Sequence, residues 1–88
     1  MFKLLYFSAP WCGPCKMTGP AIKSVSSYYN IPIEEVDCSN EKNDNLVTKF
    51  NVLSTPTIIL LDETVEVYRA QGLKNVEILK SELKEYIL

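Results

Sequence analysis

Two cysteines separated by two residues carry the most reactive side chains in this sequence. Cys12 and Cys15 stand in the segment Trp11-Cys12-Gly13-Pro14-Cys15, directly after a short apolar run. A pair at this spacing can close into a disulfide and reopen, which is the chemistry of thiol–disulfide exchange. The spacing therefore indicates a redox role rather than a purely structural one.

The place of the pair before a predicted helix gives the two sulfurs different tasks. A helix N-terminus carries partial positive charge and unpaired N–H groups, and both favour a thiolate. Cys12 precedes the helix, so we expect it to attack a substrate disulfide. Cys15 lies about one turn further along, and we expect it to be more buried and less ionised. It would attack Cys12 in the mixed disulfide and release the reduced substrate.

Three neighbours are candidates for tuning this redox chemistry. Pro14 restricts the backbone and limits the geometry in which the disulfide ring closes. Gly13 completes the motif beside it. Lys16 could stabilise a thiolate, or it could equally be an ordinary solvated lysine on a helix.

A zinc site or a chance pairing accounts less well for the two cysteines. Zinc usually takes four ligands, and the chain has no histidine and only Cys38 as a further thiol. A chance pair in a core would leave the surrounding Trp, Gly and Pro unexplained. Cys38 is expected to be a small buried hydrophobe, with a regulatory or dimer-forming thiol as the alternative. We predict no metal site and no cofactor beyond the Cys12–Cys15 disulfide.

Length and composition restrict the class of protein. A chain of 88 residues predicts one domain, residues 1–88, with a modest core. The formal net charge of −2 provides no basic surface for nucleic acid. No apolar stretch approaches the ~18 residues of a membrane span, and the N-terminal run is too short for a signal peptide. We therefore expect a cytoplasmic protein, in a compartment where such cysteine pairs are more often catalytic than structural.

Four strands and three helices are expected to position the pair. Apolar residues at helical spacing, namely Met17, Ala21, Val25 and Tyr28, predict the buried face of the first helix. The last two strands form a hairpin, and the order β-α-β-α-β-β-α defines an α/β fold. The expected elements are a strand over 3–8, a helix over 13–29, a strand over 31–37, a helix from 39 or 40 to about 51, strands over 57–61 and 65–69 joined by a turn at 62–63, and a final helix beginning after residue 75.

The segment from Trp11 to Met17, with Pro20 just beyond it, closely resembles the active-site segment of the thioredoxin family. Thr55-Pro56-Thr57 resembles the family's cis-proline loop, and Gly72 matches a family glycine that leaves room for the substrate chain. The resemblance covers essentially the whole chain. It implies a thioredoxin-like fold, with a four-stranded mixed sheet of order 2-1-3-4 flanked by helices.

The resemblance also implies general protein-disulfide reductase activity, with Cys12 as nucleophile and Cys15 as resolving thiol. The implied partners are thioredoxin reductase or a similar reductant and disulfide-containing target proteins, with the chain acting as a monomer.

The same resemblance implies a docking surface. Pro56 would be cis, with an ordinary trans turn proline as the alternative. The backbone of Thr55 would pair with an extended substrate segment. Trp11, Gly72 and the Thr55 loop would form the apolar contact area, although Trp11 could instead be a half-buried packing aromatic.

The chain departs from the family pattern at several places. It lacks the strand and helix that precede the active-site strand in full-length members, which makes the second strand an edge. Tyr6 stands where the family usually has a buried carboxylate that serves the resolving cysteine, and Glu35 falls roughly where the family has the lysine partner of that carboxylate. Ser8 replaces a second tryptophan of many members. A phenol is a weak base at neutral pH, so Tyr6 joins the tuning residues. We predict that Cys15 loses its proton to water or to the departing thiolate.

Two other functions stay open. A glutathione-dependent glutaredoxin-like protein fits the size of the chain, but the motif has Trp and Gly-Pro rather than a Pro-aromatic pair. The chain after Gly72 also lacks the expected glutathione-binding Gly-Gly and Asp pattern. The second alternative is a redox-independent module that grips a partner through Trp11, Thr55 and Gly72.

Overall fold

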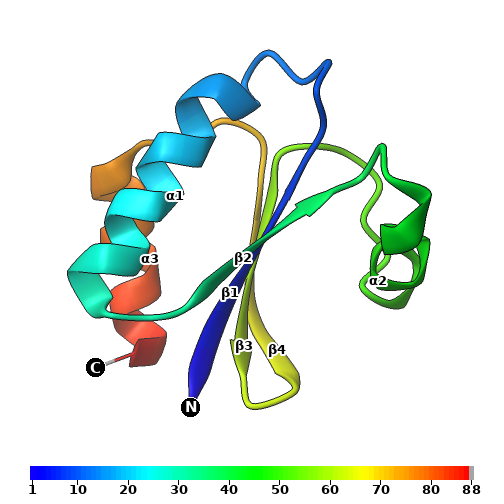
Figure 1. Cartoon of the computed structure of the whole chain (residues 1–88). Helices are drawn as coiled ribbons and strands as arrows, with labels where there is room; N and C mark the ends of the chain where they lie inside the picture. Colours follow the sequence, from blue (N-terminus) through cyan, green and yellow to red (C-terminus); the bar gives the residue numbers. More distant parts are fainter. Residues whose placement is uncertain (88) are drawn as a thin grey trace.

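The computed structural model describes residues 1–87 of the chain. Its order of strands and helices confirms the predicted α/β arrangement (Figure 1). The elements are β1 (Phe2–Ser8), α1 (Cys15–Tyr29), β2 (Ile33–Asp37), a 3-10 turn η1 (Glu41–Asn43), α2 (Asp44–Lys49), β3 (Thr57–Asp62), β4 (Val65–Gln71) and α3 (Val76–Ile87).

The four strands form one mixed sheet of order β2-β1-β3-β4, as expected. Strand β1 pairs in parallel with β2 and antiparallel with β3, and β3 and β4 form the antiparallel hairpin. Strand β2 is an edge, which fits its exposed Glu34 and Glu35. Strand β1, which leads into the cysteine pair, is held between β2 and β3.

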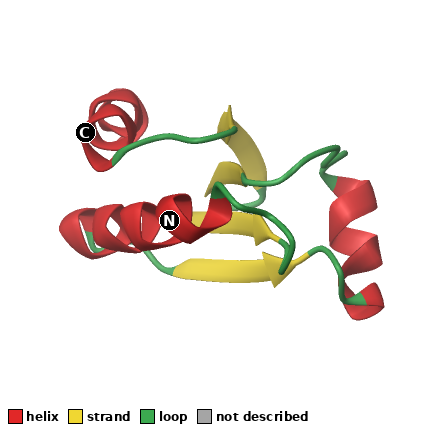
Figure 2. Cartoon of the chain, turned by 90° about the horizontal axis from the view of Figure 1, so that it is seen from above, coloured by secondary structure: helices red, strands yellow, loops and turns green. Residues whose placement is uncertain are grey.

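Helices cover both faces of the sheet. Helices α1 and α3 lie side by side on one face, and α2 lies on the other (Figures 1 and 2). Successive residues of a strand point to opposite faces. Leu4 and Tyr6 of β1 therefore join the core under α1 and α3, whereas Leu5 and Phe7 join the core under α2. This alternation fixes the direction of every side chain in the strand before the disulfide.

Several predicted boundaries are wrong by a few residues. Helix α1 begins at Cys15 rather than residue 13, because residues 13 and 14 form the turn that accepts its first hydrogen bonds. Strand β2 begins at residue 33 because the N–H of Ile31 still caps α1 at the Ser26 carbonyl. Strands β3 and β4 run on to Asp62 and Gln71, which moves the hairpin turn one residue later.

The predicted helix to about residue 51 divides into two short pieces. Asn40 caps η1 by accepting a hydrogen bond from the Lys42 N–H at 3.0 Å. Helix α2 then ends at Lys49, and Asn51 takes a left-handed conformation with φ 51°. Such a residue stops a helix.

The buried face of α1 also differs from the expected one. Met17 and Tyr28 are 67% and 64% exposed, whereas Ala21 and Val25 are buried as predicted. The helix is rotated so that its contact with the sheet includes polar and small residues that a search for apolar spacing passes over. The buried residues are Cys15, Thr18, Gly19, Ala21, Ile22, Val25 and Ser26.

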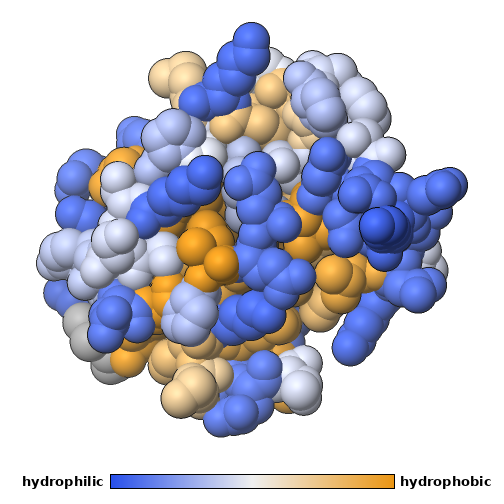
Figure 3. Space-filling model, viewed as in Figure 1, coloured by the Kyte–Doolittle hydropathy of each residue, from blue (hydrophilic) through white to orange (hydrophobic). Residues whose placement is uncertain are grey.

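On the face shown in Figure 3, apolar side chains form separate patches between hydrophilic ones. Within residues 1–87 there is no helix with the length and apolar content needed to cross a membrane.

Candidate redox site

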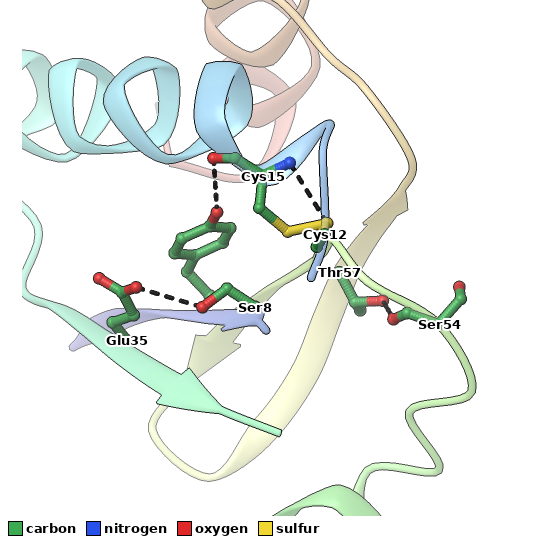
Figure 4. The surroundings of a disulfide bond; sticks show 7 residues. Ser8, Cys12, Cys15, Glu35, Ser54 and Thr57 are labelled. Atoms are coloured by element: carbon green, nitrogen blue, oxygen red, sulfur yellow. Dashed lines mark hydrogen bonds between the residues drawn. A yellow bond between two sulfur atoms is a disulfide. The ribbon is translucent and has the colours of Figure 1, made fainter. Parts of the chain in front are cut away.

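Cys12 and Cys15 form a disulfide at the junction of β1 and α1, with a Cα–Cα distance of 5.3 Å (Figure 4). Cys12 is 6% exposed and Cys15 is 9% exposed. The expectation that Cys15 is the more buried residue is therefore wrong for the oxidised state. The short ring holds both residues against the same end of the helix, so their accessibility hardly differs.

The sulfur of Cys12 lies at the N-terminus of α1. The backbone N–H of Cys15, the first residue of the helix, donates to Cys12 Sγ at 3.2 Å. The next N–H groups of the helix bond back to the carbonyls of Gly13 and Pro14. An N–H group and the positive end of the helix dipole favour a thiolate on the sulfur that they face. After reduction, this electrostatic support falls on Cys12.

Tyr6 is 2% exposed and lies under the first turn of α1. Its hydroxyl donates to the Cys15 carbonyl at 3.0 Å. Gly19 leaves the space for this hydroxyl, since a Cβ at position 19 would lie 3.3 Å from Tyr6 Oη. Burial, with a smaller contribution from the Glu35 charge, raises the pKa of Tyr6. The phenol is neutral at physiological pH, and its proton is committed to the Cys15 peptide group.

A cleft of about 380 Å³ opens beside the disulfide and is lined by both cysteines, Tyr6, Ser8 and Glu35. Ser8 Oγ donates to Glu35 Oε2 at 3.1 Å (Figure 4). From the sequence, Ser8 and Glu35 are identified only as two separate departures from the family pattern. The signal that joins them is the parallel register, which pairs Tyr6 of β1 with Glu35 of β2 and so points Ser8 and Glu35 to the same face.

The loop before β3 meets the end of β4 near this site. The Thr55–Pro56 peptide bond is cis, as expected from the sequence. Gly72 has φ 79°, which favours glycine, and its N–H donates to the Pro56 carbonyl at 3.0 Å. Trp11 is 74% exposed, which excludes a half-buried packing role. Trp11 and Thr55 line one small cleft of about 220 Å³.

The structure has an apolar groove next to α1 that the sequence does not predict. Met17 and Leu73, which are 67% and 55% exposed, line it together with Pro20. The groove has a volume of about 590 Å³. The pairing of Met17 with Leu73 depends on how the segment before α3 returns to α1, and no local pattern in the sequence reports that.

The third cysteine, Cys38, is a free thiol at the end of β2. It is partly buried and packs against the core under α2. Burial, and then the charge of Asp37, raise the pKa of the Cys38 thiol. The sequence predicts Cys38 to be a small buried hydrophobic residue, and it is partly buried. It also lines the same cleft as Trp11 and Thr55. Among the described residues, no group of three or more His, Cys, Asp or Glu is placed to hold a metal ion.

The fold and the site together define a class of protein. A Cys-X-X-Cys disulfide at a helix N-terminus, a cis-proline loop before the central strand, and a mixed sheet of this order define a thiol–disulfide oxidoreductase. Residues 2–85 match the family model described as Thioredoxin, and the chain belongs to the thioredoxin family.

Known proteins agree with this assignment. Thioredoxin of Synechocystis sp. is 30% identical over 84 residues, which cover 96% of this chain and 78% of that protein. Chloroplastic thioredoxin X of Arabidopsis thaliana is 37% identical over 86 residues, which cover 96% of this chain and 45% of that protein. The structure of oxidised thioredoxin O2 from Arabidopsis thaliana has a TM-score of 0.87 at 29% identity, covering 100% of this chain and 76% of that chain.

Proposed function

We propose that the chain reduces protein disulfides by a two-step exchange through Cys12 and Cys15. The Cys12 thiolate attacks one sulfur of a target disulfide, and the other target sulfur leaves with the electron pair. Cys15 then loses its proton and attacks Cys12 Sγ. The bond between Cys12 and the target breaks, the Cys12–Cys15 disulfide forms, and the target has gained two electrons. The disulfide itself is the redox group of this cycle, without a separate cofactor.

The observation that carries this proposal is the hydrogen bond from the Cys15 N–H to Cys12 Sγ at 3.2 Å. An N–H group facing Cys12 Sγ favours a thiolate there, and this supports the nucleophilic role proposed for Cys12. Cys15 receives the resolving role. Pro14 and Gly13 shape the turn between the sulfurs. Lys16, exposed beside the cleft, adds positive charge near the thiolate.

The target docks across the surface next to the disulfide. Trp11 supplies an exposed aromatic contact, and Thr55 presents its backbone to an extended segment of the target. A hydrogen bond joins the Gly72 N–H to the Pro56 carbonyl, and these two residues form the base of this surface. Gly72 has nothing within 4 Å of its missing Cβ, so the backbone of a target can approach closely there.

The partners proposed for the chain are a thioredoxin reductase or a similar reductant and proteins that carry disulfides. Family members typically work with such partners. We place the chain in the cytoplasm as a monomer that carries electrons between them, because a reducing compartment maintains the dithiol form. Both core clusters share the one sheet, which supports a single domain within residues 1–87.

Reduction of insulin disulfides tests this function. The assay is run in parallel with NADPH and thioredoxin reductase, and with glutathione and glutathione reductase. We expect turnover with the first donor at least ~10-fold faster than with the second, and none in the Cys12→Ser, Cys15→Ser double variant. Turnover driven only by glutathione would favour the glutaredoxin-like alternative. A double variant that retained biological function would favour the redox-independent binding module.

A further inference from the structure

The positions at which this chain departs from the family pattern meet in one cleft. Tyr6, Ser8 and Glu35 all line the cleft that reaches Cys12 and Cys15. The cleft volume of about 380 Å³ is enough for several water molecules, each of which occupies roughly 30 Å³ in the liquid. The disulfide and the Glu35 carboxylate therefore border one space that has room for water. Figure 4 shows Ser8 hydrogen-bonded to Glu35 near the disulfide.

Ser8 and Glu35 form a pair suited to receive a proton. Ser8 Oγ donates to Glu35 Oε2 at 3.1 Å, and its lone pairs are free to accept a hydrogen bond from water at the same time. Lys23 Nζ lies 3.6 Å from Glu35 Oε1, so each carboxylate oxygen has a polar neighbour. The side chain of Glu35 is 50% exposed and can pass a proton on to solvent.

The other ionisable groups facing the cleft are poorly placed for this task. Tyr6 already directs its hydroxyl to the Cys15 carbonyl. Asp37 Oδ1 accepts hydrogen bonds from both the N–H and the hydroxyl of Ser39, outside the cleft. The remaining charged side chains are Lys16 and Lys23 on α1, which are hydrogen-bond donors and not acceptors.

We propose that Glu35, acting through the Ser8 hydroxyl and cleft water, accepts the proton of Cys15 when Cys15 attacks the mixed disulfide. The inference rests on the proposed role of Cys15 as resolving thiol. Cys15 Sγ–H gives its proton to cleft water, and that water passes a proton to Ser8 Oγ as the Ser8 hydroxyl passes its own proton to Glu35 Oε2. The Cys15 sulfur then bonds to Cys12 Sγ. The bond from Cys12 to the target breaks, and the electron pair goes to the target sulfur. Glu35 then returns the proton to solvent or to the target thiolate.

This proposal extends the expectation that water takes the Cys15 proton, because the water now has a defined acceptor. Glu35 and Ser8 do not contact the reacting sulfurs. They act on Cys15 only through cleft water, and we therefore call them positioning residues and not catalytic ones. The carboxylate comes from the edge strand β2 rather than from β1, where the buried position is occupied by Tyr6.

A chromogenic aryl disulfide separates the two chemical steps in the intact 88-residue chain. The reduced protein releases one aryl thiolate when Cys12 attacks and a second when Cys15 resolves the adduct. The aryl thiolate leaves without needing a proton, so the second release reports the loss of the Cys15 proton. Stopped-flow absorbance records both phases as a function of pH.

We expect Glu35→Gln to slow the second release by ~10-fold near pH 7 and to leave the first unchanged. The difference should vanish at high pH, where Cys15 ionises without help, and added acetate should restore the rate of the variant. Ser8→Ala should slow the same phase. Glu34→Gln is the matched control, because Glu34 is the adjacent residue on the opposite face and pairs with Lys3 at 2.6 Å.

The proposal is overturned if Glu35→Gln matches the parent chain at every pH, or if it is slowed equally at all pH values. A structural role for Glu35 would produce the second pattern. Failure of the proposed function looks different, since the parent chain would then release a single thiolate, or Cys15→Ser would still release two.

Discussion

At the scale of residues, we expect Tyr6 to change how this site handles protons. It fills the core position below the redox helix and donates to the Cys15 carbonyl at 3.0 Å. Its raised pKa, caused mainly by burial, makes it a poorer acid and keeps it neutral. A neutral phenol has no proton-accepting capacity comparable to a carboxylate. Tyr6 therefore holds the peptide group of Cys15, and we expect the proton of Cys15 to go to another group.

The variant Tyr6→Phe separates these two roles. We expect the free energy of unfolding to fall by about 1 kcal/mol, because one buried hydrogen bond is lost. Turnover with insulin should change by less than ~3-fold, since the hydroxyl takes no part in proton transfer. Urea denaturation and the reductase-coupled assay measure the two effects. A strongly slowed turnover would show that the hydroxyl takes part in the reaction.

Two buried threonines give a matched test of hydrogen bonding in the core. Thr18 and Thr57 are both 0% exposed. Within residues 1–87, Thr18 Oγ1 has no hydrogen-bond partner, whereas Thr57 Oγ1 donates to the Ser54 carbonyl at 2.7 Å. Thr18→Val should raise the free energy of unfolding by about 1 kcal/mol and Thr57→Val should lower it by about 1 kcal/mol. Equal effects of the two variants in urea denaturation would contradict this assignment.

At the scale of elements, α1 and β1 are fitted to each other through Gly19 and Tyr6. A glycine inside a helix costs about 1 kcal/mol relative to alanine. Here it leaves space for Tyr6, whose Oη would lie 3.3 Å from a Cβ at position 19, whereas the ring carbons would lie 3.6 and 3.7 Å away. The close contact thus involves only the hydroxyl oxygen.

A double-mutant cycle tests this fit. In the Tyr6→Phe background, Gly19→Ala should stabilise the chain by about 1 kcal/mol, because the helix gains a residue of higher propensity without a close contact. In the parent chain the gain should be smaller or reversed, since the Tyr6 hydroxyl must shift. Thermal or urea unfolding of the four proteins gives the coupling. An additive cycle would show that Gly19 is not there to accommodate Tyr6.

The elements show which parts of the site can be predicted from sequence. The cysteine motif, the cis-proline loop and the strand order are all predicted correctly, because short segments of characteristic residues mark them. The Ser8–Glu35 contact joins residues 27 apart in the chain and depends on the register of two parallel strands. The rotation of α1, which exposes Met17, depends on the packing of Thr18 and Gly19. Such features arise from tertiary structure and have no local signal.

For the whole molecule, the buried Tyr6 and the partly buried Tyr68 predict how stability changes with pH. Burial, followed by its hydrogen bond to Glu82 at 2.6 Å, raises the pKa of Tyr68 far above the ordinary value. The pKa of Tyr6 is raised in the same direction. A folded state that holds these protons more tightly than the unfolded chain is favoured below about pH 10, and it loses this advantage as pH rises further.

The free energy of unfolding should therefore fall as pH rises above about 10, by about 1 kcal/mol near pH 11 for Tyr68 alone. Tyr68→Phe should weaken this dependence, although it also removes the hydrogen bond to Glu82. Tyr28→Phe, at a residue that is 64% exposed, is the control. Urea denaturation at pH values on both sides of 10 measures the slope. A parent chain with unchanged stability across this range would contradict the prediction.

Trapping the mixed disulfide shows whether Cys12 attacks the target and Cys15 releases it. Each single variant, Cys12→Ser and Cys15→Ser, is mixed with a disulfide-bonded protein and examined by non-reducing mass spectrometry. We expect a covalent adduct through Cys12 in the Cys15→Ser chain and none in the Cys12→Ser chain. An adduct formed equally well through Cys15, or in neither variant, would contradict this expectation.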